Sequence, residues 1–266
     1  MQFCVLGSGS KGNATYVASQ GRAFLIDNGF SGVEIERRLA AIGVETSSLT
    51  AILLTHAHSD HIKGAAVLAR KYKLPIYANK GTLDVAAKSL GAVPAIHEFH
   101  TGISFDLHHF HIHPFAICHD CADPVGFVIE NGFCTLGYCT DTGMVSRLIQ
   151  HRLAGCNGLI IECNHDPAML KNGPYPLYLQ QRVRSNQGHL ANEEAARFVA
   201  DLLHDGLQHV VLAHISETNN HPALAYDTIS AVLKSGKEAL TGISLAWQDR
   251  AGELITLKDC IGHGED

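Results

Sequence analysis

Four side chains that commonly bind metal ions stand within six residues, in the run His56-Ala57-His58-Ser59-Asp60-His61. Imidazole is the most common metal ligand in proteins, and carboxylates join it in mixed sites. His56 and His58 are two residues apart, so an extended or turning backbone can point both side chains the same way. Asp60 and His61 follow where a helix is expected to begin, so their side chains can point in another direction, toward a second metal ion. One ion cannot easily take all four ligands from so short a loop, and the run therefore predicts two ions about 3.5–4 Å apart.

The composition fits a globular protein that has such a site. The chain has 266 residues, of which 46% are hydrophobic and 17% are charged, and it contains 18 histidines. The net charge of -6 means that a nucleic-acid substrate would have to be attracted by a local patch or by bound metal. No stretch approaches the roughly 18 apolar residues that span a membrane, and no signal peptide is evident. We therefore expect a cytoplasmic protein without a membrane partner.

Many short strands, with helices in both halves, are expected to position this run. A buried strand over 51–54 delivers His56 at its carboxyl end, and a helix over 62–72 follows. The other expected strands cover 3–6, 15–18, 23–26, 75–78, 95–99, 106–114, 125–130, 134–140, 158–162, 210–213, 244–247 and 254–256. The other expected helices cover 32–42, 144–151, 191–203 (with Asn192 as its cap) and 222–233, and 171–176 is expected to be a loop. No long polar linker divides the chain, so a single α+β domain with two sheets between helices is the simplest arrangement.

A glycine-rich segment near the N-terminus imitates a dinucleotide-binding motif. Gly7-Ser8-Gly9-Ser10-Lys11-Gly12 matches G-x-G-x-x-G after a strand, and Asp27 stands at a distance suited to a ribose contact. Such a motif must open a helix, whose N-terminus binds the pyrophosphate. Here the β-branched and aromatic run 15–18 follows, and Gln20-Gly21 then turns the chain. A flexible loop near an active site, with backbone N–H groups available to a phosphate, is the better interpretation.

The histidine run, in its order and context, resembles the H-x-H-x-D-H signature of the metallo-β-lactamase superfamily. The resemblance extends over nearly the whole chain and implies a four-layer αββα sandwich formed by one domain, 1–266. It implies a first metal ion bound by His56, His58 and His119, a second bound by Asp60, His61 and His214, and Asp141 bridging both. Asp27, at the end of an upstream strand, would support the metal loop. A hydroxide held between the ions would be the nucleophile, since metal binding can lower the pKa of water to about 7.

The third histidine of the first metal site has competitors in the sequence. His108, His109, His111 and His113 lie close to His119. Residues 109, 111 and 113 would share one face of a strand, where a solvent-exposed rim is the ordinary interpretation. We favour His119 because it ends a strand before the turn 120–124, and the resemblance agrees.

Two further segments favour a phosphodiester substrate. Residues 161–166 and 187–190 resemble the Glu and Gly-His segments of ribonuclease Z and related phosphodiesterases, which include PhnP-type enzymes. The resemblance implies that Glu162 orients His189 and holds it protonated, so that His189 acts as the general acid. Together with Asp60, these are the residues to which we assign catalysis.

Three motifs resemble one bacterial group within the superfamily, the YycJ/WalJ-like proteins. They cover 8–13, 58–64 and 214–220. That group is associated with exonuclease activity on DNA, which implies a DNA substrate here. The residues that we expect to contact substrate are Ser10, Asn13, Ser216 and Asn220, and a basic rim is expected from Lys11, Lys63, Arg182 and Arg184. The stretch between Asp141 and His189 is too short for the large insertion that clamps RNA in the ribonuclease J branch.

Other functions remain open from the sequence. One is a small-molecule hydrolase that acts on a cyclic phosphate or a thioester. Another is a regulatory binding protein with a vestigial site, against which the intact ligand set argues. Zinc, manganese and iron all suit a His-rich set with carboxylates. The sequence determines neither the metal, nor the polarity of cleavage, nor the oligomeric state.

Overall fold

Residues 1–235 and 241–258 are described in the computed structural model, and their strands form two seven-stranded sheets. The first sheet has the order β14-β1-β2-β3-β4-β5-β6. Its strands are β1 (Gln2–Gly7), β2 (Ala14–Ser19), β3 (Arg22–Ile26), β4 (Leu49–Leu53), β5 (Ile76–Asn79), β6 (Ile96–Phe99) and β14 (Ile255–Thr256). The second has the order β13-β12-β11-β10-β9-β8-β7. Its strands are β7 (Phe105–Leu107), β8 (Phe110–Ala116), β9 (Val125–Glu130), β10 (Thr135–Cys139), β11 (Gly158–Glu162), β12 (His209–Ala213) and β13 (Gly242–Leu245).

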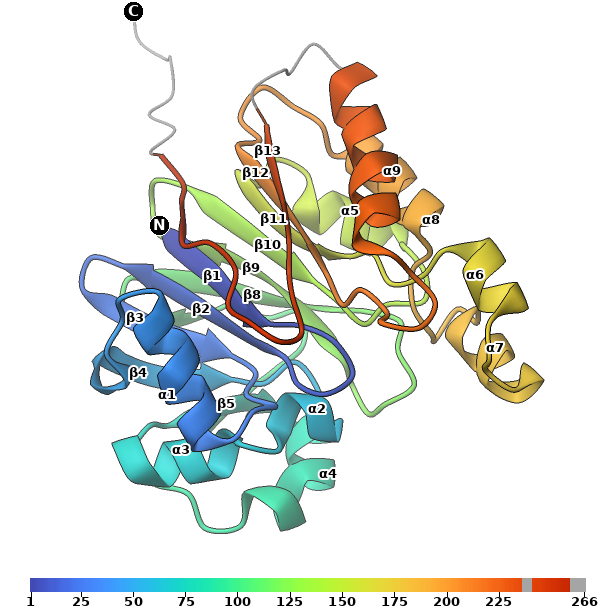
Figure 1. The fold of residues 1–266 in the computed structure, drawn as a ribbon. Coiled ribbons are helices and arrows are strands. Elements are labelled where there is room, and N and C mark those ends of the chain that lie inside the picture. Colours follow the sequence, from blue (N-terminus) through green and yellow to red (C-terminus); the bar gives the residue numbers. More distant parts are fainter. Residues whose placement is uncertain (236–240, 259–266) are drawn as a thin grey trace, which may run out of the picture.

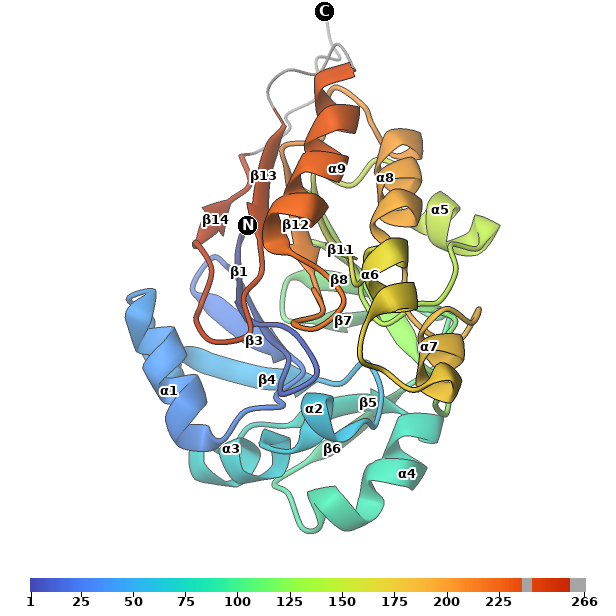
Figure 2. The ribbon, with the colours of Figure 1, turned by 45° about the vertical axis from the view of Figure 1, so that its right-hand side comes forward.

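Helices cover the outer face of each sheet (Figure 1). The first sheet is covered by α1 (Gly32–Ala41), α3 (Ala65–Tyr72) and α4 (Lys80–Leu90). The second is covered by α5 (Arg147–Leu153), α8 (Asn192–Asp201) and α9 (Pro222–Ser235). The short helices α2 (Ser59–Ile62), α6 (Pro167–Asn172) and α7 (Leu177–Val183) lie at one edge of the sandwich (Figures 1 and 2). A 3₁₀ turn covers Thr46–Ser48. None of the helices in the described part of the chain is long and apolar enough to cross a membrane.

Three hydrophobic layers hold this arrangement together. Strands alternate their side chains between two faces, so each sheet contributes to two layers. Phe3 and Phe24 of the first sheet pack with Phe110 and Phe127 of the second, between the sheets. The outer layers pack each sheet against its own helices. Because the central layer draws on both halves of the chain, we propose that the chain forms a single domain.

The strand directions bring the polar loops to one edge. β3 and β4 are parallel, and so are β10, β11 and β12. The carboxyl ends of parallel strands meet at the same edge of a sheet. Asp27 follows β3, Asp141 follows β10, Glu162 ends β11 and His214 follows β12. These side chains therefore gather at the edge where α2 and α7 lie.

Several elements differ from the sequence expectations. The helix expected over 62–72 is divided into α2 and α3 around Gly64, where an added Cβ would meet Phe30 O. The strand expected over 106–114 is the hairpin β7–β8, which turns at His108 with a φ of 58°. Asn192 does not cap α8: it lies in the first turn, and Glu194 accepts the cap N–H of Ala191. Helices α4, α6 and α7 were not expected at all.

The glycine-rich loop after β1 joins two antiparallel strands, and no helix begins there. This is the arrangement that the sequence interpretation favoured over a dinucleotide site.

Candidate metal centre

Two sets of metal-capable side chains converge at the edge of the sandwich. Within each set, the donor atoms lie within 4.8 Å of one another. The first set is His56, His58 and His119, and the second is Asp60, His61 and His214. Asp141 forms a third set with His56 and His61, one residue from each of the other two, and a fourth with Glu162, His189 and His214. Asp141 therefore lies within reach of donor atoms from both of the first two sets, and its role as a bridging ligand stays a prediction.

The separations between donor atoms suit ions held between them. Two ligands 2.0–2.1 Å from a tetrahedral ion lie about 3.3 Å apart. His58 Nδ1 lies 3.2 Å from His119 Nε2. Asp141 Oδ1 lies 3.3 Å from His214 Nε2, and Asp141 Oδ2 lies 3.5 Å from His61 Nε2. Within the described residues, Asp141 Oδ2, His56 Nε2 and His214 Nε2 are buried without a hydrogen-bond partner. Buried polar atoms without partners are costly, so the donor set fits bound cations.

In three of these histidines, the ring nitrogen Nδ1 lies within hydrogen-bond distance of another residue of the protein. His56 Nδ1 lies 2.9 Å from Thr55 Oγ1, and His119 Nδ1 lies 3.2 Å from Gln187 O. His61 Nδ1 lies 2.8 Å from Asp27 Oδ2. Histidine ligands ordinarily donate their second N–H to such acceptors, which sets the ring orientation and leaves the other nitrogen for the metal.

Asp27, which the sequence predicts to support the metal loop, contacts Thr55 and His61 at the two ends of that loop. Its side chain is fully buried, and it accepts hydrogen bonds from Thr55 N and Thr55 Oγ1, both at 2.8 Å. Burial raises the pKa of Asp27, although His61 and Thr55 oppose that rise. The aspartate therefore fixes both the start of the loop and the ring of His61.

Glu162 connects two histidines. Its Oε1 lies 2.7 Å from His189 Nδ1 and 3.2 Å from His214 Nδ1. Its Oε2 accepts hydrogen bonds from the backbone N–H groups of Thr142 and Leu190. Burial would raise the pKa of Glu162, but His189 and His214 lower it to about 2. Both oxygens are thus in use, so Glu162 is suited to orienting histidines rather than to binding a metal itself.

Three site residues adopt left-handed backbone conformations. The φ angles are 59° for Asp27, 58° for Asp141 and 54° for His214. Such angles are uncommon outside glycine and are found mostly where the surrounding structure enforces them, often at active sites. Asp27 and His214 directly follow β3 and β12, and Asp141 lies two residues after the end of β10, so this conformation turns each side chain toward the centre.

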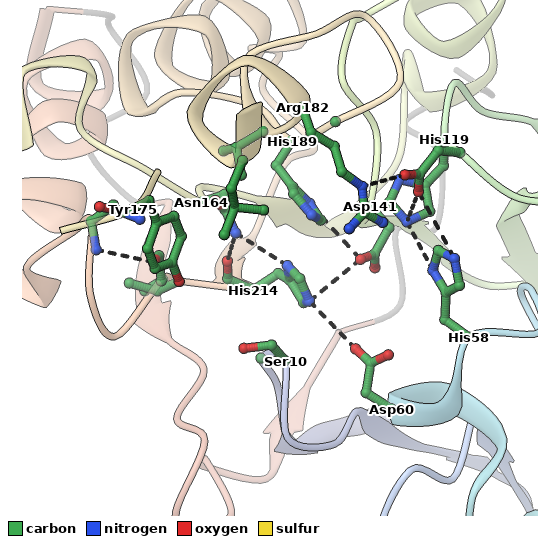
Figure 3. A pocket seen from close by; sticks show the side chains of 18 of the residues that line it. Ser10, His58, Asp60, His119, Asp141, Asn164, Tyr175, Arg182, His189 and His214 are labelled. Atoms are coloured by element: carbon green, nitrogen blue, oxygen red, sulfur yellow. Dashed lines mark hydrogen bonds and ion pairs between the residues drawn. The ribbon is translucent and has the colours of Figure 1, made fainter. Parts of the chain in front are cut away.

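A cavity of about 340 Å³ opens above the metal-capable residues (Figure 3). Ser10 and Ser216, both expected to contact substrate, line it, as does His189. Asn13 and Asn220 do not. Asn13 is buried, and its Nδ2 lies 3.1 Å from Asp60 Oδ2 and 3.0 Å from His61 Nε2. Asn220 is also buried and bonds to Asn192 and to the backbone of 163–164.

The competing histidines lie away from the centre. His111 pairs with Asp106 on the surface, His113 pairs with Ser104, and neither belongs to a metal-capable set found among the described residues. Of the expected basic rim, Arg182 lines the cavity, whereas Lys11 pairs with Glu217. Lys63 and Arg184 are not among the residues that line it.

The sequence interpretation missed three residues of the site. Asn164 Nδ2 donates to His214 O at 2.7 Å and lies 3.2 Å from His214 Nδ1. Asp120 Oδ2 accepts from Arg182 Nε at 2.6 Å, beside the first metal set. Tyr175 lines the cavity from a segment expected to be only a loop. Asn164 lies inside the segment 161–166 and Asp120 directly follows His119, whereas Tyr175 has no local signal.

Comparisons with known proteins show which family model, relatives and solved fold the chain is similar to. A family model described as "Beta-lactamase superfamily domain" matches residues 22–215. The chain is 38% identical over 237 residues to exodeoxyribonuclease YycJ of Bacillus anthracis, covering 88% of this chain and 89% of that protein. It is 36% identical over 232 residues to exodeoxyribonuclease WalJ of Streptococcus pneumoniae, covering 86% of each. The crystal structure of the metallo-β-lactamase fold protein YhfI from Bacillus subtilis matches with a TM-score of 0.72 at 17% identity, covering 94% of this chain and 98% of that one. The expected four-layer fold is confirmed.

Proposed function

The chain belongs to the β-lactamase superfamily, and we propose that within it the protein is a metal-dependent exonuclease that hydrolyses phosphodiester bonds of DNA. The single observation that carries this proposal is the pairing of Glu162 with His189 beside the two metal-capable sets, which Asp141 connects through its own set with His56 and His61. Relatives called exodeoxyribonucleases, similar over most of their length, support DNA as the substrate. A cytoplasmic location stays a prediction from the sequence.

We propose that two divalent ions, zinc or manganese, with iron as an alternative, are held by the two sets and by Asp141. When bound, they supply an acidified water as the nucleophile and polarise the phosphate as Lewis acids. Asp60 orients this part of the site through its contacts with Asn13 and His61.

His189 is proposed to protonate the leaving oxygen. Glu162 is ionised and 2.7 Å from Nδ1, so it stabilises the imidazolium and leaves Nε2 for the substrate. His189 lines the cavity, so its ring has access to a bound phosphodiester. A positioned acid of this kind contributes about 10²–10⁴-fold to the rate.

A second candidate is hydrolysis of a small phosphodiester such as a cyclic phosphate. The cavity, at about 340 Å³, lies near the lower end of small-molecule pockets, which run from about 300 to 1,000 Å³. The net charge of -6 also provides no general attraction for a polyanion.

One assay separates the two candidates. Protein loaded with manganese or zinc is incubated with 5′-phosphorylated DNA, single- and double-stranded, and separately with bis(p-nitrophenyl) phosphate and a cyclic nucleotide. We expect progressive, metal-dependent release of nucleotides from DNA, reduced at least about 100-fold in His61→Ala. Rapid turnover of the small substrates without action on DNA would favour the second candidate. Absence of any cleavage in both metals would exclude both.

A further inference from the structure

Helix α7 lies over the cavity but contributes nothing to the hydrophobic core. None of its residues is buried, and Leu177 and Tyr178 are 68% and 73% exposed. Leu179, Arg182 and Val183 nevertheless line the cavity. Because burial of apolar surface is what ordinarily holds a helix in place, the packing of α7 gives no reason for its position. A ligand in the cavity would supply that reason.

Tyr175, just before α7, presents an aromatic ring to the same cavity. Its backbone carbonyl accepts a hydrogen bond from Gln180 Nε2 at 2.8 Å, which ties the loop to the helix. Gly173 approaches Asn219 so closely that an added Cβ would lie 2.6 Å from Asn219 Oδ1. No ring of another described residue is stacked on Tyr175. These contacts hold the backbone of residues 173–175, and the ring of Tyr175 keeps a face open to the cavity.

Arg182 extends from α7 toward the metal-capable residues. Its Nε donates to Asp120 Oδ2 at 2.6 Å, and Asp120 Oδ1 lies 3.7 Å from His119 Nε2. Figure 3 shows the side chain reaching past His189 toward Asp141 and His119. Its two terminal nitrogens have no hydrogen bond to any other described residue, and guanidinium nitrogens bind phosphate oxygens well.

We propose that the segment 173–183 reads the terminal nucleotide of a single-stranded end: Tyr175 stacks on its base while Arg182 contacts its phosphate. This inference rests on the proposed nuclease function and names its substrate class. In Figure 3, Tyr175 and His58 lie on opposite sides of the cavity, with Arg182 above it. A base against Tyr175 thus leaves the phosphate near the metal sets. The small cavity suits one unpaired nucleotide rather than a base pair.

The test compares two single-stranded oligonucleotides that differ only in the terminal base at the end where degradation begins. One has an ordinary thymine, and the other has an abasic tetrahydrofuran residue. Stacking of one base is worth about 5- to 150-fold in binding. We expect the abasic end to raise KM of the wild-type enzyme by that factor. In Tyr175→Ala this ratio should fall to about one, and in Tyr175→Phe it should be retained.

Arg182→Gln should raise KM on both oligonucleotides, because it acts on the phosphate. The matched controls are Tyr226→Ala on α9 and Arg197→Gln on α8, which change the same residue types at exposed positions outside the cavity lining. Both should behave like the wild type. Melting curves of all variants check folding.

If the wild-type enzyme degrades DNA with equal KM at basic and abasic ends, or if Tyr175→Ala keeps the wild-type ratio, the inference is overturned and the proposed function stands. If the wild-type enzyme degrades no DNA, the proposed function fails, and the inference fails with it.

Discussion

At the scale of single residues, the site combines metal-facing atoms with an outer set of hydrogen bonds. Asp27 and Glu162 each hold the rear nitrogen of at least one histidine. Asn13 and Asn164 add amide contacts to the second metal set. These contacts limit the rotation of the rings before any ion binds, which reduces the cost of assembling the centre.

Asp27→Asn should weaken metal binding by about 10- to 100-fold, because the amide cannot act as the anionic partner of His61 Nδ1. The measurement is a titration of metal-free protein with zinc or manganese in competition with a chelating dye. Asp106→Asn is the control, since Asp106 Oδ1 also lies 2.8 Å from a histidine Nδ1, that of His111, but on the surface. Equal metal affinity in both variants would contradict the role given to Asp27.

His189→Gln should impair cleavage according to the leaving group. With DNA, whose leaving alkoxide needs a proton, kcat should fall by about 10²-fold or more. With bis(p-nitrophenyl) phosphate the loss should be below about 10-fold, because p-nitrophenolate leaves without protonation. His151→Gln, on the surface of α5, serves as the control. Equal losses on the two substrates would exclude His189 as the general acid.

At the scale of elements, the loops of the site are held by close backbone approaches and by one buried arginine. An added Cβ on Gly29 would meet Asp60 O, so only glycine allows the chain after β3 to approach the metal loop. Arg38 of α1 donates to Leu6 O at 2.6 Å and to Gln248 O at 2.9 Å. Gln248 in turn bonds to the glycine-rich loop that lines the cavity. Helix α1 therefore supports the glycine-rich loop indirectly, through the hydrogen bonds that Arg38 and Gln248 make.

Arg38→Met should lower the free energy of unfolding by about 3 kcal/mol, because it leaves buried carbonyls and Glu34 without their partner. Arg37→Met is the matched control. Arg37 pairs with the same glutamate, but its side chain is 57% exposed, so the loss should stay below about 1 kcal/mol. Urea unfolding followed by circular dichroism measures both. If both variants lost a similar free energy of unfolding, the burial of Arg38 would not contribute to stability.

At the scale of the whole molecule, the proposed ions would join the two sheets. His56, His58, Asp60 and His61 follow strand β4 of the first sheet, whereas Asp141 and His214 follow strands of the second. Binding of a ligand to the folded state alone stabilises that state by mass action. The centre should therefore be structural as well as catalytic.

Removal of metal by a chelator should lower the melting temperature by about 10 °C, and added zinc or manganese should restore it. This follows from about 4 kcal/mol of stabilisation at a free metal concentration about 1,000 times Kd. Differential scanning calorimetry measures the shift. In an Asp141→Ala/His61→Ala double variant the chelator should have little effect; an equal shift there would place the stabilising ion elsewhere.

The sequence alone determined the features that depend on neighbours in the chain. The metal loop was recognisable because four donors stand within six residues, and the strands showed their apolar runs. His119, Asp141 and His214 were predictable as a set only through the family resemblance, and the structure brings them together with the loop. Helix α4 has a local start signal, the cap Asn79, whose side chain accepts a hydrogen bond from Thr82 N.

Only the tertiary structure decided which distant side chains meet. Three such contacts are the second contact of Glu162, with His214, the support that Asn13 gives to the metal loop instead of lining the cavity, and the place of Tyr175 in the cavity wall. Contacts of this kind join residues tens of positions apart. A local pattern does not encode them, because the same strand and loop residues could face either side until both sheets are packed.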